Sequence, residues 1–305
     1  MENELRDIMK IIGLIPKRKS KRLHNMVTNF LEGAKKRGYG TSTRNITKST
    51  GVNKINVNNF NLVVSSGWAS YVNKIINHYK VPNIVIFDPQ IRPTSKFCRG
   101  NGYKHYWGVC WNGPHRGYKY NDSLPNDRWL ALKKKYSINI KPWRTNGNTI
   151  VIAHQPNLGF DGESRTEFYD DIIQKCVKQS RKKRVVICVS PVGSGKHATN
   201  EQINSWKYMG CEVITSVDRG ILDNAWCFIS SGGTTASKAL FAGIPVYGNE
   251  LNITDPIRTK QSLDDFIKNP DTPDRTNWFN WIAYQQWTFE EMINGLAFDY
   301  MMSIR

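Results

Sequence analysis

Cys227-Phe-Ile-Ser-Ser-Gly-Gly-Thr-Thr-Ala-Ser-Lys-Ala-Leu-Phe-Ala-Gly-Ile-Pro-Val-Tyr247 combines an apolar strand, a glycine turn, a small-residue helix and a second strand. The spacing predicts strands over 227–229 and 246–247 and a helix over 235–242, which Gly243 ends. The two glycines of the turn allow a ligand to approach the backbone, and the free N–H groups at the start of the helix favour an anion. This stretch therefore predicts a phosphate-binding turn within an α/β fold.

Strands and helices alternate through the whole second half of the chain. Such alternation predicts a parallel sheet with helices on both faces, and ligands of such sheets bind at the carboxyl ends of the strands. The stretch 276–300 is helical and rich in tryptophan, and we expect it to pack on the core. The remaining elements predicted in this half are strands over 149–153, 184–189 and 212–214 and helices over 165–180, 200–209 and 219–224.

The first half is less regular. Residues 22–36 predict an amphipathic helix, and residues 38–59 form a polar stretch without clear periodicity. Strands over 61–64 and 84–87 around a helix over 68–79 then predict a βαβ unit. A further helix over 127–136 precedes a Pro- and Gly-containing linker at 141–148. The expected organisation is a basic N-terminal arm over 1–59, one Rossmann-like domain over 60–145 and a second over 146–305 that carries the Trp-rich helix.

Positive charge is concentrated in the first half. The chain has 43 Lys and Arg residues against 25 Asp and Glu residues, a net charge of +18. Residues 1–141 carry 26 of the basic residues and 7 of the acidic ones, whereas residues 142–305 carry 17 and 18. So many positive charges repel one another unless a polyanion neutralises them, so nucleic acid is the expected partner. A solvated basic surface is the alternative.

The basic residues occur in clusters, and between residues 96 and 120 they alternate with Phe, Tyr and Trp. This mixture suits contact with both phosphates and bases, and it also suits a twisted hairpin in a core. The predicted DNA contacts are Lys17, Arg18, Lys19, Lys21, Arg22, Lys35, Lys36, Arg37, Arg92, Lys96, Arg99, Lys104, Arg116 and Lys119.

A second glycine-containing loop, Ser190-Pro-Val-Gly-Ser-Gly-Lys-His197, resembles the end of an ATP-binding P-loop. It departs from that motif because Ser190 stands where a glycine is needed and His197 where a magnesium-binding hydroxyl is needed. No acidic strand end of the Walker B type accompanies it. The residues of this loop that remain candidates for contact with a diphosphate are Gly193, Ser194, Gly195 and Lys196.

Asp88 directly follows the predicted strand 84–87. A carboxylate at the carboxyl end of a strand can act as a general base on a hydroxyl. The alternative is a capping or salt-bridging role beside Arg92 and Arg99. No hydrolase triad is supported, because no serine or cysteine lies in a nucleophile elbow. Other titratable residues in loops or at strand ends of the second half are the rival bases Asp161 and Glu163 and the histidines His154 and His197.

The stretch 231–246 resembles the donor-binding region of nucleotide-sugar glycosyltransferases of the GT-B fold. That family has a small-Gly-Gly/Ser turn, an alanine-rich helix and a Gly-[Val/Ile]-Pro segment, as Ser231-Gly-Gly, Ala236-Ser-Lys-Ala-Leu-Phe-Ala and Gly243-Ile-Pro do here. The resemblance implies two Rossmann-like domains facing a cleft, with the acceptor on the N-terminal one, the donor on the C-terminal one and a C-terminal helix packing across. It implies no tightly bound cofactor and no required metal, because helix dipoles and basic side chains stabilise the leaving diphosphate. The expected donor contacts are Gly193, Ser194, Gly195, Lys196, Ser231, Gly232, Gly233, Thr234, Thr235, Lys238 and Glu250.

With the charge contrast added, the chain resembles the phage DNA glycosyltransferases more specifically. The resemblance implies transfer of a sugar from a UDP-sugar to the hydroxymethyl group of a modified pyrimidine, such as hydroxymethylcytosine, in double-stranded DNA. Base flipping and a single displacement, with Asp88 accepting the proton, are the implied steps. A GT-B enzyme acting on a lipid or polysaccharide, and a non-enzymatic DNA-binding protein on a GT-B scaffold, are the alternatives.

The sequence also bears on the compartment. Its apolar runs are shorter than the roughly 18 residues that a membrane-spanning helix needs. Acidic and basic residues interrupt any apolar region before Ile11, so no secretion signal is evident. We therefore expect a cytoplasmic protein, in the host cytoplasm if it is phage-encoded, without a membrane partner.

Overall fold

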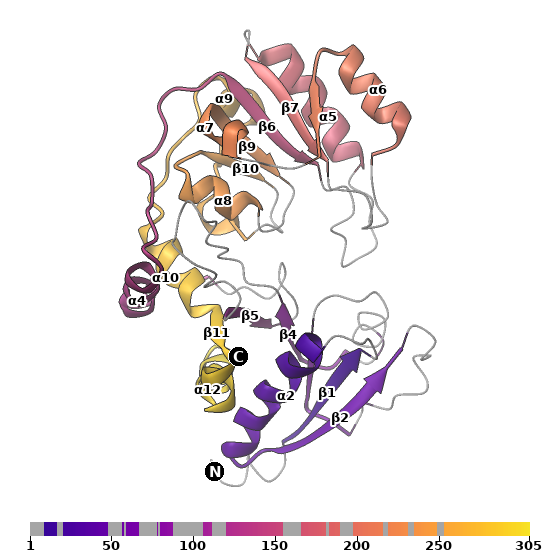
Figure 1. Ribbon diagram of the computed structural model, residues 1–305, viewed down its shortest axis with the longest axis vertical. Helices are drawn as coiled ribbons and strands as arrows, with labels where there is room; N and C mark the ends of the chain where they lie inside the picture. The colour runs from indigo at the N-terminus through magenta and orange to yellow at the C-terminus, as the bar shows by residue number, and fades with distance from the viewer. Residues whose placement is uncertain are drawn as a thin grey trace. The chain divides into compact units, whose positions relative to one another are not determined.

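The chain forms two compact α/β units in the computed structural model (Figure 1). The first unit contains the described residues between 9 and 129 together with 280–305, and the second contains those between 130 and 279. The chain therefore passes between the units inside α4 (Asp127–Tyr136) and again inside α10 (Thr276–Tyr284). The structure describes residues 9–16, 21–47, 57, 59–66, 78, 80–87, 106–111, 120–154, 166–180, 183–189, 198–215, 219–230, 235–248 and 253–305.

The first unit is built on a six-stranded sheet with the order β11-β5-β4-β3-β1-β2. β1 to β4 run parallel, β5 is antiparallel to β4, and β11 is antiparallel to β5. The chain leaves β1 for β2 on one side and reaches β3 on the other side, which makes the strand order reverse at β1. The strands are β1 (Lys10–Pro16), β2 (Gly40–Ile46), β3 (Leu62–Ser66), β4 (Asn83–Phe87), β5 (Tyr106–Trp111) and β11 (Gln286–Thr288).

Both faces of this sheet are apolar, as β1 illustrates. Ile11 belongs to the core cluster beneath α2 (Lys21–Lys36), whereas the next residue, Ile12, belongs to a cluster on the opposite face. A Cβ atom added to Gly13 would lie 2.6 Å from side-chain atoms of Leu31 and Val27, so the glycine lets α2 approach β1 closely. α11 (Phe289–Ile293) and α12 (Leu296–Ser303) supply further residues to the cluster beneath α2.

The sheet corrects the expected N-terminal arm over 1–59, because β1 and β2 are part of it and α2 packs on it. The apolar run in β1 carried a signal for a strand. β2 carried little, because it is an edge strand and Ile46 is its buried residue. The C-terminal end also differs from the expected division, since β11, α11 and α12 belong to the first unit rather than the second.

Several tryptophans of the described segments pack in the core, whereas Tyr120 and Tyr208 are exposed. Trp278 and Trp281 of the Trp-rich stretch are fully buried, which confirms that this stretch packs on the core. Trp107 and Trp111 belong to the segment 96–120, for which contact with DNA was one expectation and a hairpin in a core was the other. Both are buried in β5. Trp107 stacks on the ring of Phe289 at a centroid distance of 5.1 Å. The core interpretation therefore holds for these two tryptophans.

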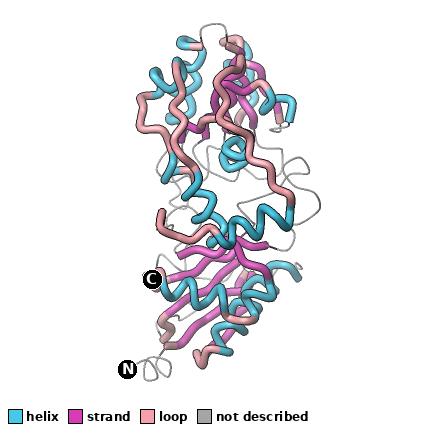
Figure 2. The backbone as a smooth tube through the Cα atoms, turned by 90° about the vertical axis from the view of Figure 1, so that its left-hand side faces the viewer, coloured by secondary structure: helices cyan, strands magenta, loops and turns pink. Residues whose placement is uncertain are grey.

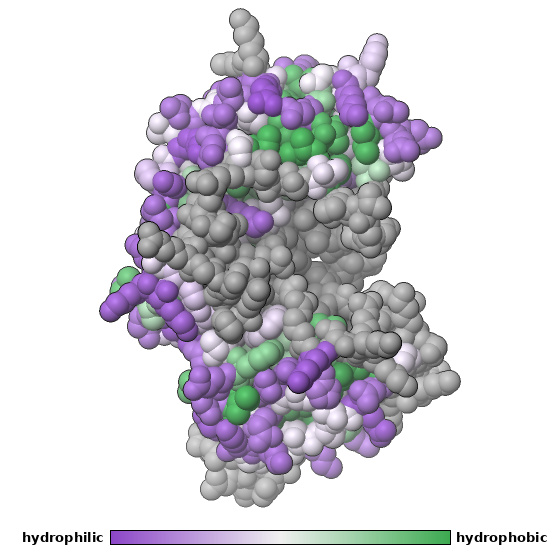
Figure 3. Space-filling model, in the orientation of Figure 1, coloured by the Kyte–Doolittle hydropathy of each residue, from purple (hydrophilic) through white to green (hydrophobic). Residues whose placement is uncertain are grey.

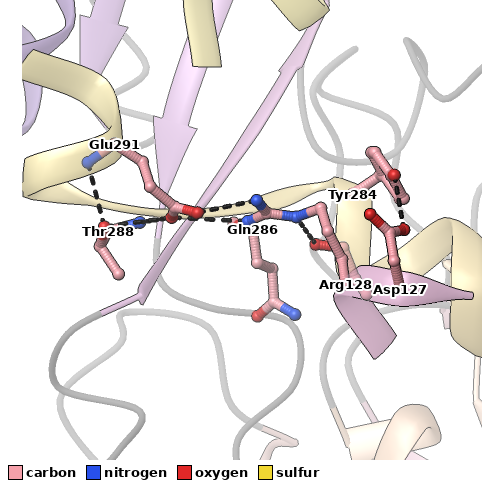
Figure 4. Close-up of polar contacts among 7 residues, drawn as sticks. Asp127, Arg128, Tyr284, Gln286, Thr288 and Glu291 are labelled. Atoms are coloured by element: carbon pink, nitrogen blue, oxygen red, sulfur yellow. Dashed lines mark hydrogen bonds and ion pairs between the residues drawn. The ribbon is translucent and has the colours of Figure 1, made fainter. Parts of the chain in front are cut away.

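Arg128, in the first turn of α4, fastens the C-terminal segment to the first unit (Figure 4). Its guanidinium donates to Glu291 at 2.7 Å and to the carbonyl of Gln286 at 2.6 Å. It also lies 4.0 Å from the ring centroid of Trp287. Burial would raise the pKa of Glu291, but the hydrogen bonds from Arg128 and Thr288 bring that pKa below its ordinary value.

Replacing Arg128 by methionine is expected to lower the free energy of unfolding by about 2–3 kcal/mol, because it leaves the half-buried Glu291 carboxylate without its cation. Urea unfolding followed by tryptophan fluorescence measures the change. Arg128→Lys is expected to recover only part of the loss, since an ammonium cannot donate to both acceptors and stack on Trp287. A full recovery by lysine would contradict the role given to the planar guanidinium.

The second unit has a five-stranded parallel sheet with the order β10-β9-β6-β7-β8. Figure 2 shows the strands of this unit with helices packed around them. The predicted helices and strands of this half are confirmed to within about two residues at most ends. The elements are β6 (Thr149–His154), α5 (Thr166–Gln179), β7 (Arg184–Val189), α6 (Asn200–Tyr208), β8 (Glu212–Ile214), α7 (Arg219–Asp223), β9 (Ala225–Ser230), α8 (Thr235–Phe241), β10 (Val246–Gly248), the 3-10 helix η3 (Asp255–Ile257) and α9 (Leu263–Lys268).

The predicted linker at 141–148 is an extended segment fixed to the second unit. The Lys141 N–H donates to the carbonyl of Phe241 at 3.0 Å, and the Arg144 N–H donates to the carbonyl of Gly243 at 2.7 Å. Gly243 has a φ of +73°, and a Cβ atom there would lie 1.9 Å from the Pro142 carbonyl oxygen. The boundary between the units therefore lies earlier in the chain than predicted, inside α4.

Candidate functional site

The carboxyl ends of the strands in the second unit lie level along one edge of the sheet. Ala153 of β6 is in register with Ser230 of β9, and Ser230 is in register with Gly248 of β10. From β6 the chain goes to β7 on one side of the sheet and later returns to β9 on the other side. The strand order thus reverses between β6 and β9, and ligands of open α/β sheets bind at such a switch point.

His154, the last residue of β6, is the titratable side chain described at this switch point. It is 2% exposed, and its Nε2 atom has no hydrogen-bond partner within the described parts of the chain. The imidazole centroid lies 4.6 Å from that of Tyr169 in α5 and 4.8 Å from that of Trp206 in α6. Burial lowers the pKa of His154 to about 4, so the ring is uncharged at neutral pH.

The pKa of His154 predicts a pH dependence of stability. The unfolded ring takes up a proton near pH 6.5 and the folded ring only near pH 4, so the free energy of unfolding falls as the pH drops through this window. The expected contribution is about 3 kcal/mol at full protonation. Urea unfolding at pH 7 and pH 4.5 is expected to show a smaller loss for His154→Leu than for the wild type. Equal losses would contradict the assignment.

The donor contacts predicted from the sequence follow the strands of this edge. Thr235 is the first residue of α8, and Lys238 lies one turn further along the same helix. The other predicted donor residues lie outside the described residues and stay predictions: Gly193, Ser194, Gly195, Lys196, Ser231, Gly232, Gly233, Thr234 and Glu250.

In the first unit, the carboxyl edge next to the strand reversal carries two buried hydroxyls. Ser65 and Ser66 end β3, and their Oγ atoms have no hydrogen-bond partner among the described residues. The strand predicted from the sequence ended at residue 64, but both serines are strand residues. β4 ends at Phe87, and the predicted base Asp88 that follows it lies outside the described residues, as do Asp161 and Glu163.

Some predicted DNA contacts lie at the two ends of α2. Lys21 begins the helix, Lys35 and Lys36 form its last turn, and these three side chains are exposed. Arg37 instead forms an ion pair with Asp299 of α12 at 2.6 Å, so a phosphate would have to compete with that carboxylate. The side chains of the other predicted contacts are not among those described: Lys17, Arg18, Lys19, Arg22, Arg92, Lys96, Arg99, Lys104, Arg116 and Lys119.

Three further properties of the described residues concern the polarity of the surface, membrane helices and metal ligands. Hydrophilic side chains cover most of the described surface in the view of Figure 3. None of the described helices is long and apolar enough to span a bilayer. Within the same described segments, no group of three His, Cys, Asp or Glu side chains lies close enough together to hold a metal ion.

His154 was predicted from the sequence as a titratable residue of the second half, but it was not predicted that His154, Ser65 and Ser66 are buried polar residues at the two sheet edges. Each of them ends an apolar run, as in Thr149-Ile-Val-Ile-Ala-His154 and Leu62-Val-Val-Ser-Ser66. A polar residue that closes a buried strand was therefore the available signal. Because the sequence has no nucleophile elbow, it did not support a role for His154 in a hydrolase triad. It assigned His154 no other specific role.

Comparison with known proteins identifies the fold. No protein-family model matches the sequence, and no curated protein matches it. Among solved structures, the chain is similar to the KpsC beta Kdo 2,4 transferase of Thermosulfurimonas dismutans, with 12% identity, a TM-score of 0.50 and 91% of both chains covered. It is equally similar to the KpsC beta Kdo 2,7 transferase of that organism, with 12% identity, a TM-score of 0.50 and coverage of 94% of this chain and 98% of that one. The chain therefore has the fold of these transferases, which confirms the predicted pair of Rossmann-like GT-B domains.

Proposed function

We propose that the protein is a glycosyltransferase that uses a nucleotide-sugar donor. The observation that carries this proposal is the second unit, a parallel sheet that reverses its strand order between β6 and β9 and continues from β9 into the small-residue helix α8. Rossmann-like sheets bind nucleotides at such a reversal. The GT-B fold of the whole chain supports the same function.

For the acceptor, we propose the hydroxymethyl group of a modified pyrimidine in double-stranded DNA. The charge of the chain supports this choice, because residues 1–141 carry 26 basic residues against 7 acidic ones. Contacts between basic side chains and phosphates supply most of the affinity of a protein for DNA, whatever the sequence. The target base has to leave the helix to reach a catalytic site.

In the proposed reaction the hydroxymethyl oxygen attacks the anomeric carbon of the donor sugar. A carbon–oxygen bond forms there, the bond to the diphosphate breaks, and the proton of the hydroxyl passes to Asp88. The nucleoside diphosphate leaves toward the start of α8, where backbone N–H groups favour negative charge. A single displacement of this kind inverts the configuration at the anomeric carbon.

A glycan acceptor is the second candidate function. The two similar structures support it, since they are named as beta Kdo transferases and this chain has the same fold. The acceptor distinguishes the two candidates, whereas the donor-binding unit serves both.

Release of free nucleotide from a panel of UDP-, CMP- and GDP-sugars tests the proposed donor chemistry. We expect the wild type to release nucleotide from one donor, faster when acceptor is present. Gly233→Trp is expected to abolish release, because its side chain fills the predicted diphosphate site. Gly40→Ala is the matched control, since a Cβ atom at Gly40 meets nothing within 4 Å. Release at an unchanged rate by Gly233→Trp would place the donor elsewhere.

A further inference from the structure

His154 holds a hydrogen-bonding atom that the described fold leaves unused. The side chain is almost fully buried, and Nε2 finds no acceptor or donor among the described residues. The rings of Tyr169 and Trp206, both buried, contact the imidazole. The imidazole is therefore held in place, and it cannot turn toward another protein group without displacing one of these rings.

The surroundings of His154 do not explain why a polar residue is kept there. The hydroxyl of Tyr169 is already used, because it donates to the carbonyl of Ala153 at 2.8 Å. Buried polar groups in proteins are hydrogen-bonded in nearly all cases, and exceptions occur at sites that bind ligands. A leucine or phenylalanine would fill the same space without an unpaired nitrogen.

The position of His154 supplies the second observation. It is the last residue of β6, and the strand order of this sheet reverses between β6 and β9. A ligand that binds at the reversal lies beyond the carboxyl ends of these two strands. The unpaired nitrogen of His154 therefore lies at the edge of the sheet where such a ligand binds.

We propose that Nε2 of His154 donates a hydrogen bond to a phosphate oxygen of the nucleotide bound by the second unit. The inference rests on the proposed function and deepens it, since it assigns a phosphate contact to a residue outside the two glycine-containing loops. The uncharged ring provides one N–H donor when Nε2 carries the proton, and phosphate oxygens accept such bonds. The geometry makes His154 a ligand-binding residue and not an acid or base.

The test compares His154→Leu and His154→Gln with the wild type. Binding of UDP, CDP and CMP is measured by calorimetry, and the melting temperature of the ligand-free protein is measured in parallel. We expect His154→Leu to weaken binding of the preferred nucleotide about 10-fold or more, with a melting temperature equal to or above that of the wild type. His154→Gln keeps an N–H donor near the position of Nε2 and is expected to restore most of the affinity.

The corresponding nucleoside without phosphate is the internal control, and its binding is expected to be the same for all three proteins. Equal nucleotide affinities for His154→Leu and the wild type would overturn the inference alone. A lower melting temperature of His154→Leu with unchanged affinity would do the same and would make His154 a structural residue. Absence of nucleotide binding by the wild type would overturn the proposed function and this inference with it.

Discussion

Gly33→Val is expected to destabilise the first unit by about 3 kcal/mol or more and to abolish activity. Gly33 lies in α2, where a Cβ atom would be 2.0 Å from the Met292 carbonyl oxygen and 2.9 Å from Cα of Gly295. Both contacts are with backbone, so no side chain can move aside to make room. α11 and α12 would have to separate from α2 and expose the core cluster that these three helices share.

Circular dichroism during urea unfolding measures this effect. Gly40→Ala, the matched control from the same unit, is expected to change the free energy of unfolding by less than about 0.5 kcal/mol. A free energy for Gly33→Val within about 1 kcal/mol of the wild type would mean that α2 does not pack against the turn between α11 and α12.

Asp88→Asn is expected to lower kcat by about 10²–10⁴-fold, the usual contribution of a general base. The asparagine keeps the shape of the side chain and cannot take the proton of the attacking hydroxyl. Affinity for the nucleotide sugar is expected to stay the same, since the proposed base acts on the acceptor. Steady-state kinetics with donor and acceptor varied in turn separates the two effects.

Glu32→Gln is the control for a lost carboxylate in the same unit, because Glu32 is exposed on α2. It is expected to leave kcat unchanged. Normal turnover by Asp88→Asn together with a large loss in Asp161→Asn or Glu163→Gln would move the base to the second unit. The sequence leaves these two carboxylates open as rivals.

Secondary structure was predictable where the core itself generates the pattern. Most predicted strands of the second sheet are apolar runs, and a helix such as α5 buries one side in the same core cluster as β6. Such elements are set by local periodicity, so the predicted bounds agree with the observed ones. α4 was likewise predicted over the residues that form it.

The elements that the sequence did not predict depend on contacts between distant residues, which do not show in sequence periodicity. β11 has three residues, and its Gln286 pairs with Gly108 of β5, which lies far away in the sequence. β2 is a polar edge strand, so its side chains follow no alternation of burial. The helices after β11 pack in the first unit, where Arg128 donates to Glu291 of α11 and Gly33 lies against the backbone of Met292 and Gly295. Neither Arg128 nor Gly33 indicates such a partner in the sequence.

The candidate site follows the same division. The alternation of strands and helices predicted the parallel sheet of the second unit, and its strand order reverses at the edge where we propose that the nucleotide binds. The unpaired nitrogen of His154 could not be predicted from the sequence, because the rings that surround the imidazole, Tyr169 and Trp206, come from two different helices. The predicted glycine turns and Asp88 stay predictions.

Nucleoside analysis by mass spectrometry tests the central claim most directly. Duplex DNA containing hydroxymethylcytosine or hydroxymethyluracil is incubated with the protein and each nucleotide sugar, then digested to nucleosides. The account predicts a nucleoside heavier by the mass of one transferred sugar, together with an equal amount of released nucleotide. Unmodified nucleosides and no nucleotide release with every donor, from DNA and from glycan acceptors alike, would contradict it.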